Sequence, residues 1–228
     1  MVKKKGYRTD PKNIIKTLEL LTKATRDSDA PLKEFEKVQT NDPFKVLVAT
    51  ILSSRTKDEV TTEAAKRLFS VAKNLEELSK LSVNEIEALI YPVGFYKNKA
   101  RFLSALPSAL EAFGGKIPSS MDRLLSLPGV GRKTANLVLA RAFGKPTICV
   151  DTHVHRLSNL WGWVRTNSPE ETEKALKELL PKRYWSRVNS VLVAFGQSVC
   201  KPVSPMCVSC PLNDWCPGKK LQKNEAIS

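Results

Sequence analysis

Helix-start signals recur along this 228-residue chain, and they constrain its fold more than any other feature. The pairs Asp42-Pro43 and Ser168-Pro169 each place a capping side chain before a proline at the first helical position. Ser82 and Glu85 have the spacing of a capping box. Apolar residues at helical spacing follow each signal, whereas strand-like alternation is nearly absent and the β-rich run 147–150 is too short to build a sheet. The sequence therefore predicts an all-α protein.

The charge of the chain is unusual for an ordinary globular composition. Thirty-seven Lys and Arg residues stand against 23 Asp and Glu residues, which gives a formal net charge of +14. Such a surplus indicates a polyanionic partner such as nucleic acid, although a lysine-rich solvated surface would give the same total. The sequence contains no apolar run of the roughly 18 residues that span a bilayer, and its basic start leads into no secretory signal. We expect a cytoplasmic protein with no membrane partner, nucleoid-associated if prokaryotic, and a disordered polar tail at 219–228.

The stretch LPGVGRKTAN, residues 127–136, predicts a tight turn between two helices, at 120–127 and 134–143. Pro128 ends the first helix, and Gly129 and Gly131 allow backbone angles that other residues avoid. Backbone amides in such a turn and at the start of the next helix have no intrahelical partners, so they could bind a phosphate. A plain turn between helices is the alternative, but two glycines followed by Arg132 and Lys133 favour the anion site.

Four cysteines lie within 17 residues near the end of the chain, in the pattern C-x6-C-x2-C-x5-C. A reducing compartment disfavours disulfides, and so many thiols in so short a stretch are not explained by core packing. Four thiolates can bind zinc or an iron–sulfur cluster. A fifth cysteine, Cys149, lies in an apolar run and is predicted to be a small buried side chain. The ligand candidates are Cys200, Cys207, Cys210 and Cys216.

The hairpin residues resemble the helix–hairpin–helix motif of DNA-binding proteins. The longer stretch LPGVGRKTANLVLARAFGKPTICVDTHVHRL resembles the central segment of the endonuclease III family of DNA base-excision glycosylases, without gaps. In that family a hairpin lysine and a downstream aspartate form the active site, and here these positions are Lys133 and Asp151. The resemblance also implies that Gly129, Val130, Gly131 and Arg132 contact the DNA backbone. It extends over most of the chain, from about Asp42 to Cys216.

The residues themselves are compatible with these roles. Lys133 is expected in the first turn of a helix beside Arg132, and both the positive helix end and the neighbouring cation favour a neutral, nucleophilic amine. Asp151 follows the apolar run 148–150 and precedes a predicted helix, so it is a candidate N-cap whose carboxylate is held in place. Taken without the resemblance, Asp151 would be interpreted as a simple cap.

The resemblance implies a bifunctional enzyme, both a DNA glycosylase and a lyase. A damaged base is flipped out of double-stranded DNA, Lys133 attacks the deoxyribose, and the strand is cut by β-elimination after a Schiff base forms. The expected partner is double-stranded DNA that contains damaged bases or abasic sites, and the expected substrates are oxidised pyrimidines. Family members generally act as monomers, so a monomer is expected here. Branches that only remove the base lack a lysine at the position of Lys133.

Two further stretches resemble loops with which the family reads DNA, and the chain departs from the family pattern in both. Arg55 stands where a glutamine is usual, and Val93 and Phe95 lie in the second loop, with Phe95 where a leucine is usual; all three are expected to contact DNA. An arginine can fill the gap left by a flipped base, and a phenylalanine can stack where leucine wedges. The alternatives are a solvated cation at a helix end for Arg55 and a core aromatic for Phe95.

In the family, the four-cysteine spacing holds a [4Fe–4S] cluster, which is the expected cofactor here. Lys201 lies in the loop after the first cysteine, so the cluster could hold a basic loop against DNA phosphates. A cluster that only fixes the C-terminus is the other possibility. The resemblance further implies two helical lobes, one at 36–145 with the hairpin and one formed by 1–35 plus 146–228 with the cluster. The cleft between such lobes would hold Lys133 on one wall and Asp151 on the other.

Two other functions are compatible with parts of the sequence. A monofunctional glycosylase for uracil or mismatched thymine would not need Lys133 as a nucleophile. A non-catalytic DNA-binding module with a redox cluster would leave Asp151 unexplained. We therefore predict the bifunctional enzyme.

Overall fold

The computed structural model describes residues 10–218, and the predicted disordered tail at 219–228 lies outside them. The described residues contain twelve α-helices, one short 3-10 helix and no strand, so the all-α prediction is confirmed. They divide into two compact units, residues 31–147 and residues up to Ala30 together with those from Ile148 onward. The boundaries implied by the family resemblance are 36 and 145. None of the described helices has the length and apolar character needed to cross a membrane.

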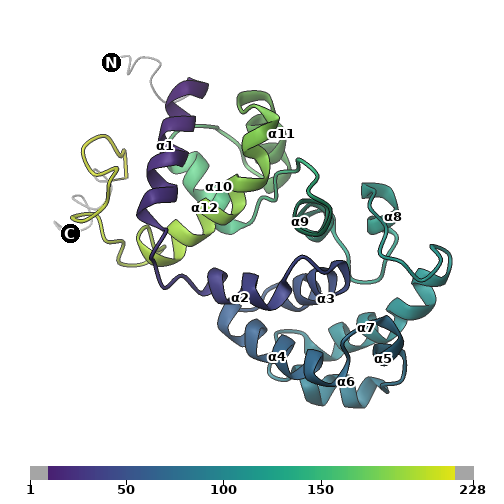
Figure 1. Ribbon diagram of the computed structural model, residues 1–228. Helices are drawn as coiled ribbons and strands as arrows, with labels where there is room; N and C mark the ends of the chain where they lie inside the picture. The colour runs from purple at the N-terminus through teal and green to yellow at the C-terminus, as the bar shows by residue number, and fades with distance from the viewer. Residues whose placement is uncertain (1–9, 219–228) are drawn as a thin grey trace. The chain divides into compact units, whose positions relative to one another are not determined.

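The unit formed by residues 31–147 is built around α3, whose residues 46–52 are all nearly inaccessible to solvent. In this unit α3 packs against α9 as well as against α2, α4 and α7 (Figure 1). The strong burial of α3 explains why its sequence is apolar on every side. The helices of this unit are α2 (Pro31–Gln39), α3 (Pro43–Ser53), α4 (Asp58–Val71), α5 (Leu75–Ser79), α6 (Val83–Ile90), α7 (Tyr96–Glu111), α8 (Met121–Leu125) and α9 (Arg132–Phe143).

The other unit is built around α12, which buries nearly all of its residues between 188 and 196. Helices α1 and α10 pack against α12, and α11 packs against α10 (Figure 1). After α12 the chain continues without helices through the four-cysteine segment. The elements of this unit are α1 (Pro11–Ala24), α10 (Thr152–Leu160), α11 (Pro169–Leu179), the 3-10 helix η1 (Lys182–Tyr184) and α12 (Trp185–Ser198).

The helix-start signals form the predicted caps. Asp42 accepts a hydrogen bond from the Phe44 amide at 2.8 Å, and Ser82 and Glu85 make the reciprocal bonds of a capping box. Ser168 caps α11. Around the hairpin the helices differ slightly from the prediction, since α8 ends at Leu125 and α9 begins at Arg132. Arg132 and Lys133 therefore lie inside the first turn of α9.

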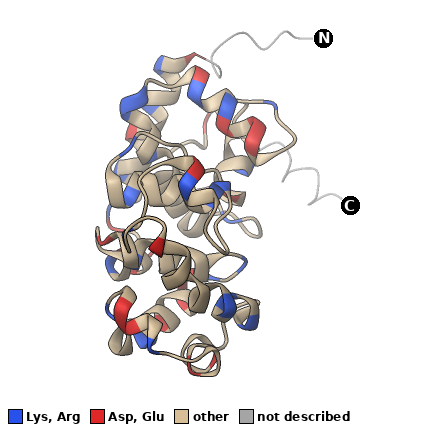
Figure 2. Cartoon of the chain, turned by 90° about the vertical axis from the view of Figure 1, so that its right-hand side faces the viewer, with Lys and Arg blue, Asp and Glu red and all other residues tan. Residues whose placement is uncertain are grey.

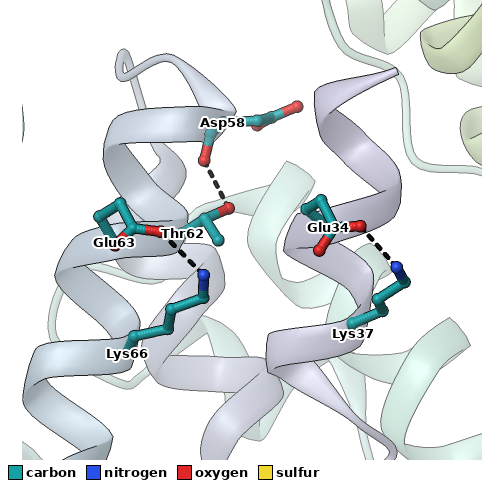
Figure 3. A network of polar contacts seen from close by, with 6 residues as sticks. All are labelled: Glu34, Lys37, Asp58, Thr62, Glu63 and Lys66. Carbon is teal, nitrogen blue, oxygen red and sulfur yellow. Dashed lines mark hydrogen bonds and ion pairs between the residues drawn. The ribbon is translucent and has the colours of Figure 1, made fainter. Parts of the chain in front are cut away.

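Lys, Arg, Asp and Glu residues are distributed over many helices rather than confined to one of them (Figure 2). On α2 and α4, Lys37 pairs with Glu34 at 2.5 Å and Lys66 with Glu63 at 2.8 Å (Figure 3). Both pairs are exposed, and exposed pairs contribute little to stability because water screens them. The positive surplus of the chain is therefore of interest for binding rather than for folding.

Candidate nucleic-acid interface and catalytic residues

Gly129, the first of the two glycines in the hairpin between α8 and α9, cannot be replaced without strain. Gly129 has φ +75°, a left-handed conformation that favours glycine. A Cβ atom at this position would lie 2.6 Å from the ring of Phe102, which belongs to α7. Leu127 and Val130 are buried on either side and anchor the turn. The hairpin is thus a fixed structure rather than a loose loop.

Gly131 has a different role from the predicted one. Its backbone is extended, with φ −97° and ψ 179°, so any residue could adopt it and the expectation of a special conformation was wrong. No atom lies within 4 Å of the position where its Cβ would be, and Gly131 offers α9 no side-chain cap. The absence of a side chain therefore keeps the start of α9 open to an approaching group.

Lys133 lies on the exposed side of the first turn of α9. The opposite side of the helix buries residues 134–136, 138 and 139, and α9 packs on α3 within the same unit. The first-turn amides of a helix and its positive dipole end face the same direction as such a side chain. The hairpin therefore places a primary amine beside a surface suited to a phosphodiester.

Asp151 is the N-cap of α10, as predicted. Its Oδ1 atom accepts a hydrogen bond from the Val154 amide at 2.9 Å. The preceding residues 148–150 are buried, and Asn189 of α12 donates to the Cys149 carbonyl at 3.2 Å. The prediction that Cys149 is a buried side chain is confirmed. Both sides of Asp151 are thus fixed, which holds its half-buried carboxylate in one orientation.

Arg55 and Phe95 contact each other, although forty residues separate them in the sequence. The Arg55 guanidinium carbon lies 5.5 Å from the centroid of the Phe95 ring, a cation–π geometry. Both residues have a left-handed backbone, with φ 53° and φ 57°. Phe95 is 59% exposed, so it is not the core aromatic that was the alternative. Val93, by contrast, is 1% exposed, so its side chain supports the loop from inside and does not reach the surface.

Sequence reasoning missed the residue that joins these two loops, Lys99 of α7. Its side chain is buried, and its ammonium donates to the Leu52 and Ser54 carbonyls and to the Thr56 hydroxyl. A signal was present, since Lys99 lies one helical turn before Leu103 on the buried face of α7. A lysine at an apolar position of a helix indicates a specific partner.

The four candidate ligand cysteines line one pocket. Its other walls include Trp161 and Phe195, whose ring centroids are 5.9 Å apart. No group of three or more His, Cys, Asp or Glu side chains in residues 10–218 is arranged to hold a single metal ion. Lys201 follows the first cysteine and is exposed. The cysteines are Cys200, Cys207, Cys210 and Cys216.

Hydrogen-bond donors already point at two of these sulfurs. The Leu212 amide lies 3.4 Å from the Cys210 sulfur, and the Arg156 guanidinium lies 3.9 Å from the Cys200 sulfur while also binding the Cys200 carbonyl. Burial raises the pKa of both thiols, and Arg156 opposes this for Cys200. Four thiols, apolar walls and donors to sulfur fit an iron–sulfur cluster, whose potential depends on such hydrogen bonds.

Comparisons with known proteins agree with this geometry. Residues 48–182 match the family model described as HhH-GPD superfamily base excision DNA repair protein. Endonuclease III from Thermotoga maritima is 49% identical over 176 residues, which are 77% of this chain and 83% of that protein. A solved structure of a trapped covalent endonuclease III–DNA intermediate, an estranged-adenine complex, matches with a TM-score of 0.82 and 37% identity. The match covers 93% of this chain and 98% of the chain in that structure. A non-covalent endonuclease III–DNA complex matches over the same shares with a TM-score of 0.83 and 36% identity.

Proposed function

The chain belongs to the endonuclease III family of the HhH-GPD superfamily, a family of bifunctional DNA glycosylases and AP lyases in base excision repair, and we propose that it excises oxidised pyrimidines from double-stranded DNA with Lys133 as nucleophile. The observation that carries this assignment is the exposed primary amine in the first turn of α9, directly after the glycine hairpin. Similarity to a relative captured as a covalent DNA intermediate supports an enzyme that forms a bond to its substrate.

The chemistry requires a neutral Lys133 amine. Its nitrogen attacks C1′ of the damaged nucleotide, the N-glycosidic bond breaks, and the base departs with the bonding electron pair and takes up a proton. The C1′–O4′ bond then opens to give an iminium ion between Lys133 and the sugar. Loss of a proton from C2′ expels the 3′ phosphate by β-elimination, and water finally hydrolyses the iminium ion and releases the enzyme.

Asp151 supplies the negative charge that this reaction needs. A carboxylate near the sugar would accept the proton that Lys133 loses and would stabilise the positive charge that develops as the base departs. The cap bond to Val154 fixes the orientation of the carboxylate before substrate binds. We propose that Asp151 acts on the same sugar as Lys133.

The hairpin and the loop residues would hold the DNA. The Val130 amide already donates to the Leu127 carbonyl, so the backbone amides around Gly131 and Arg132 would bind a phosphate at the helix N-terminus, and the open space at Gly131 would let the DNA backbone approach. Arg55 and Phe95 would occupy the duplex where the damaged base leaves, with Phe95 stacking and Arg55 donating to the unpaired base. Lys201 would add a phosphate contact.

We infer that Cys200, Cys207, Cys210 and Cys216 hold a [4Fe–4S] cluster, the cofactor that the family typically carries. When bound, the cluster supplies four strong links between segments of the helix-free C-terminal region, and it orders Lys201 with them. Arg156 would neutralise part of the negative charge of the ligand thiolates. The cytoplasmic location of the enzyme stays a prediction.

Borohydride trapping on duplex DNA with one thymine glycol tests the nucleophile. The wild-type protein should give a covalent protein–DNA band, and Lys133→Ala should abolish it. Lys80→Ala, which removes an exposed lysine on the surface beside α5, should leave the band unchanged. Asp151→Asn should weaken the band without unfolding the protein, because asparagine is an equally good N-cap. Base release without a band would overturn the assignment in favour of the monofunctional glycosylase.

A further inference from the structure

A buried ammonium without a carboxylate partner requires an explanation. Lys99 is 4% exposed, and its three hydrogen-bond acceptors are all neutral oxygens. Taking a cation out of water is costly unless its donors are satisfied. Here the three protons of the ammonium match three acceptors, at 2.7 Å from the Leu52 carbonyl, 2.5 Å from the Ser54 carbonyl and 3.1 Å from the Thr56 hydroxyl. Burial lowers the pKa of Lys99 to about 8, so the charged form with three donors still predominates at neutral pH.

Two of these acceptors lie at the C-terminal end of α3. Carbonyls in the last turn of a helix lack intrahelical partners, and the helix dipole is negative there. The Ser54 amide makes only a long bond of 3.4 Å, to Ile51. Lys99 therefore acts as a C-cap for α3, although it belongs to a different helix. It fixes the point at which the chain leaves α3 and enters the loop that carries Arg55.

The third acceptor connects that loop to the loop before α7. The Thr56 hydroxyl accepts from Lys99 and also from the Gly94 amide, in both cases at 3.1 Å. The loops touch closely here, because a Cβ atom on Gly94 would lie 2.6 Å from the Arg55 carbonyl oxygen. Arg55 lies directly before Thr56, and Phe95 lies directly after Gly94. The contact network of Lys99 thus ends at the two residues that form the cation–π pair.

We propose that Lys99 is a positioning residue which locks the Arg55 and Phe95 loops into a single DNA-reading element, an inference that rests on the proposed function. Lys99 is buried and its ammonium donates only to groups of the protein itself, so it acts through other residues and not on the substrate. It determines where Arg55 and Phe95 stand relative to one another, and so whether both can enter a duplex around one flipped base. Loss of this lock should reduce the recognition of lesions more than the binding of undamaged DNA.

The test uses the full-length protein with Lys133→Ala, so that substrate is bound and not consumed. The measured quantity is the ratio of Kd for undamaged duplex to Kd for a duplex with a tetrahydrofuran abasic-site analogue. Lys99→Met keeps the apolar stem and removes all three hydrogen bonds. We expect this ratio to fall at least tenfold, and thermal unfolding is recorded in parallel. Lys97→Met removes an exposed charge from the same helical turn, so it should weaken both Kd values alike and leave the ratio unchanged.

Two further variants distinguish positioning from stability. Lys99→Arg keeps the charge and donors and should retain part of the discrimination, and Thr56→Val breaks the link to Gly94 and should reduce the ratio while α3 keeps its cap. An unchanged ratio in Lys99→Met and Thr56→Val, whatever their melting temperatures, would overturn the inference. Failure of the proposed function would appear elsewhere, as a wild-type protein that traps no oxidised-pyrimidine substrate but still discriminates the abasic analogue.

Discussion

Gly129→Ala is predicted to destabilise the protein strongly, although it adds a single methyl group to a surface turn. Gly129 has φ +75°, and its new Cβ atom would meet the Phe102 ring at 2.6 Å. The left-handed backbone costs about 1–2 kcal/mol for a residue with a Cβ atom. Forcing the methyl group against the ring costs about 1–3 kcal/mol more. The free energy of unfolding should therefore fall by about 2–5 kcal/mol.

Gly131→Ala is the matched control, since it makes the same chemical change two residues away. Gly131 is extended and has open space at its Cβ position, so its unfolding free energy should change by no more than about 0.5 kcal/mol. The methyl group would nevertheless stand where the DNA backbone is proposed to approach, so affinity for DNA should fall. One glycine is thus predicted to serve folding and the other to serve DNA binding.

Urea unfolding of four proteins separates the two contributions at Gly129. The wild type, Gly129→Ala, Phe102→Ala and the double variant form a cycle whose coupling energy isolates the steric contact. In the Phe102→Ala background the ring contact is gone and only the 3.2 Å contact with the Cβ atom of residue 102 is left, so Gly129→Ala should cost mainly the backbone part, about 1–2 kcal/mol. Equal destabilisation by alanine at positions 129 and 131, or a coupling energy near zero, would refute this account of the hairpin.

Three other perturbations have distinct expected outcomes. Asp151→Ala should lower the unfolding free energy by about 0.5–2 kcal/mol through loss of the cap bond to Val154, whereas Asp151→Asn should keep that stability and lose activity, as urea unfolding and trapping assays would show. The folded-state pKa of Lys99 is lowered to about 8 from an ordinary 10.5, so between these values the unfolded chain binds more protons than the native one. The unfolding free energy of the wild type relative to that of Lys99→Met should therefore rise with pH across this window. This stability difference is fully present above pH 10.5 and is lost as the pH falls to 8. A stability difference that does not change with pH would contradict this account. Cys207→Ser should lose bound iron and acid-labile sulfide in elemental analysis, while Cys149→Ser, outside the pocket, should keep both.

Local rules predicted much of the fold because they act within a few residues. The caps at Asp42, Ser82 and Asp151 depend only on a side chain and an amide two or three positions later. Such contacts can be inferred from spacing alone. The same holds for the four cysteines, which lie close together in the sequence and line one pocket in the structure.

Contacts between distant segments could not be inferred in this way. Nothing in the sequence pairs Lys99 with the end of α3, because the approach of α7 to α3 is set by the packing of the whole unit. The burial of Val93 and the exposure of Phe95 likewise depend on a left-handed residue that no sequence pattern indicates. The conformation of Gly131 was mispredicted for the same reason. The sequence alone does not distinguish a glycine that leaves space for an approaching group from a glycine that adopts a left-handed backbone.

Helix α10 couples two parts of the proposed site that the sequence presents as unrelated. Its N-terminus is capped by Asp151, and one turn further along Arg156 binds the carbonyl and approaches the sulfur of Cys200. A short helix moves as a rigid body, because each backbone hydrogen bond ties one turn to the next. Any change in the cysteine pocket that pulls on Arg156 would therefore also move the carboxylate at the start of the same helix. A cluster bound at these cysteines would in this way influence the proposed catalysis without taking part in it, through the position of Asp151.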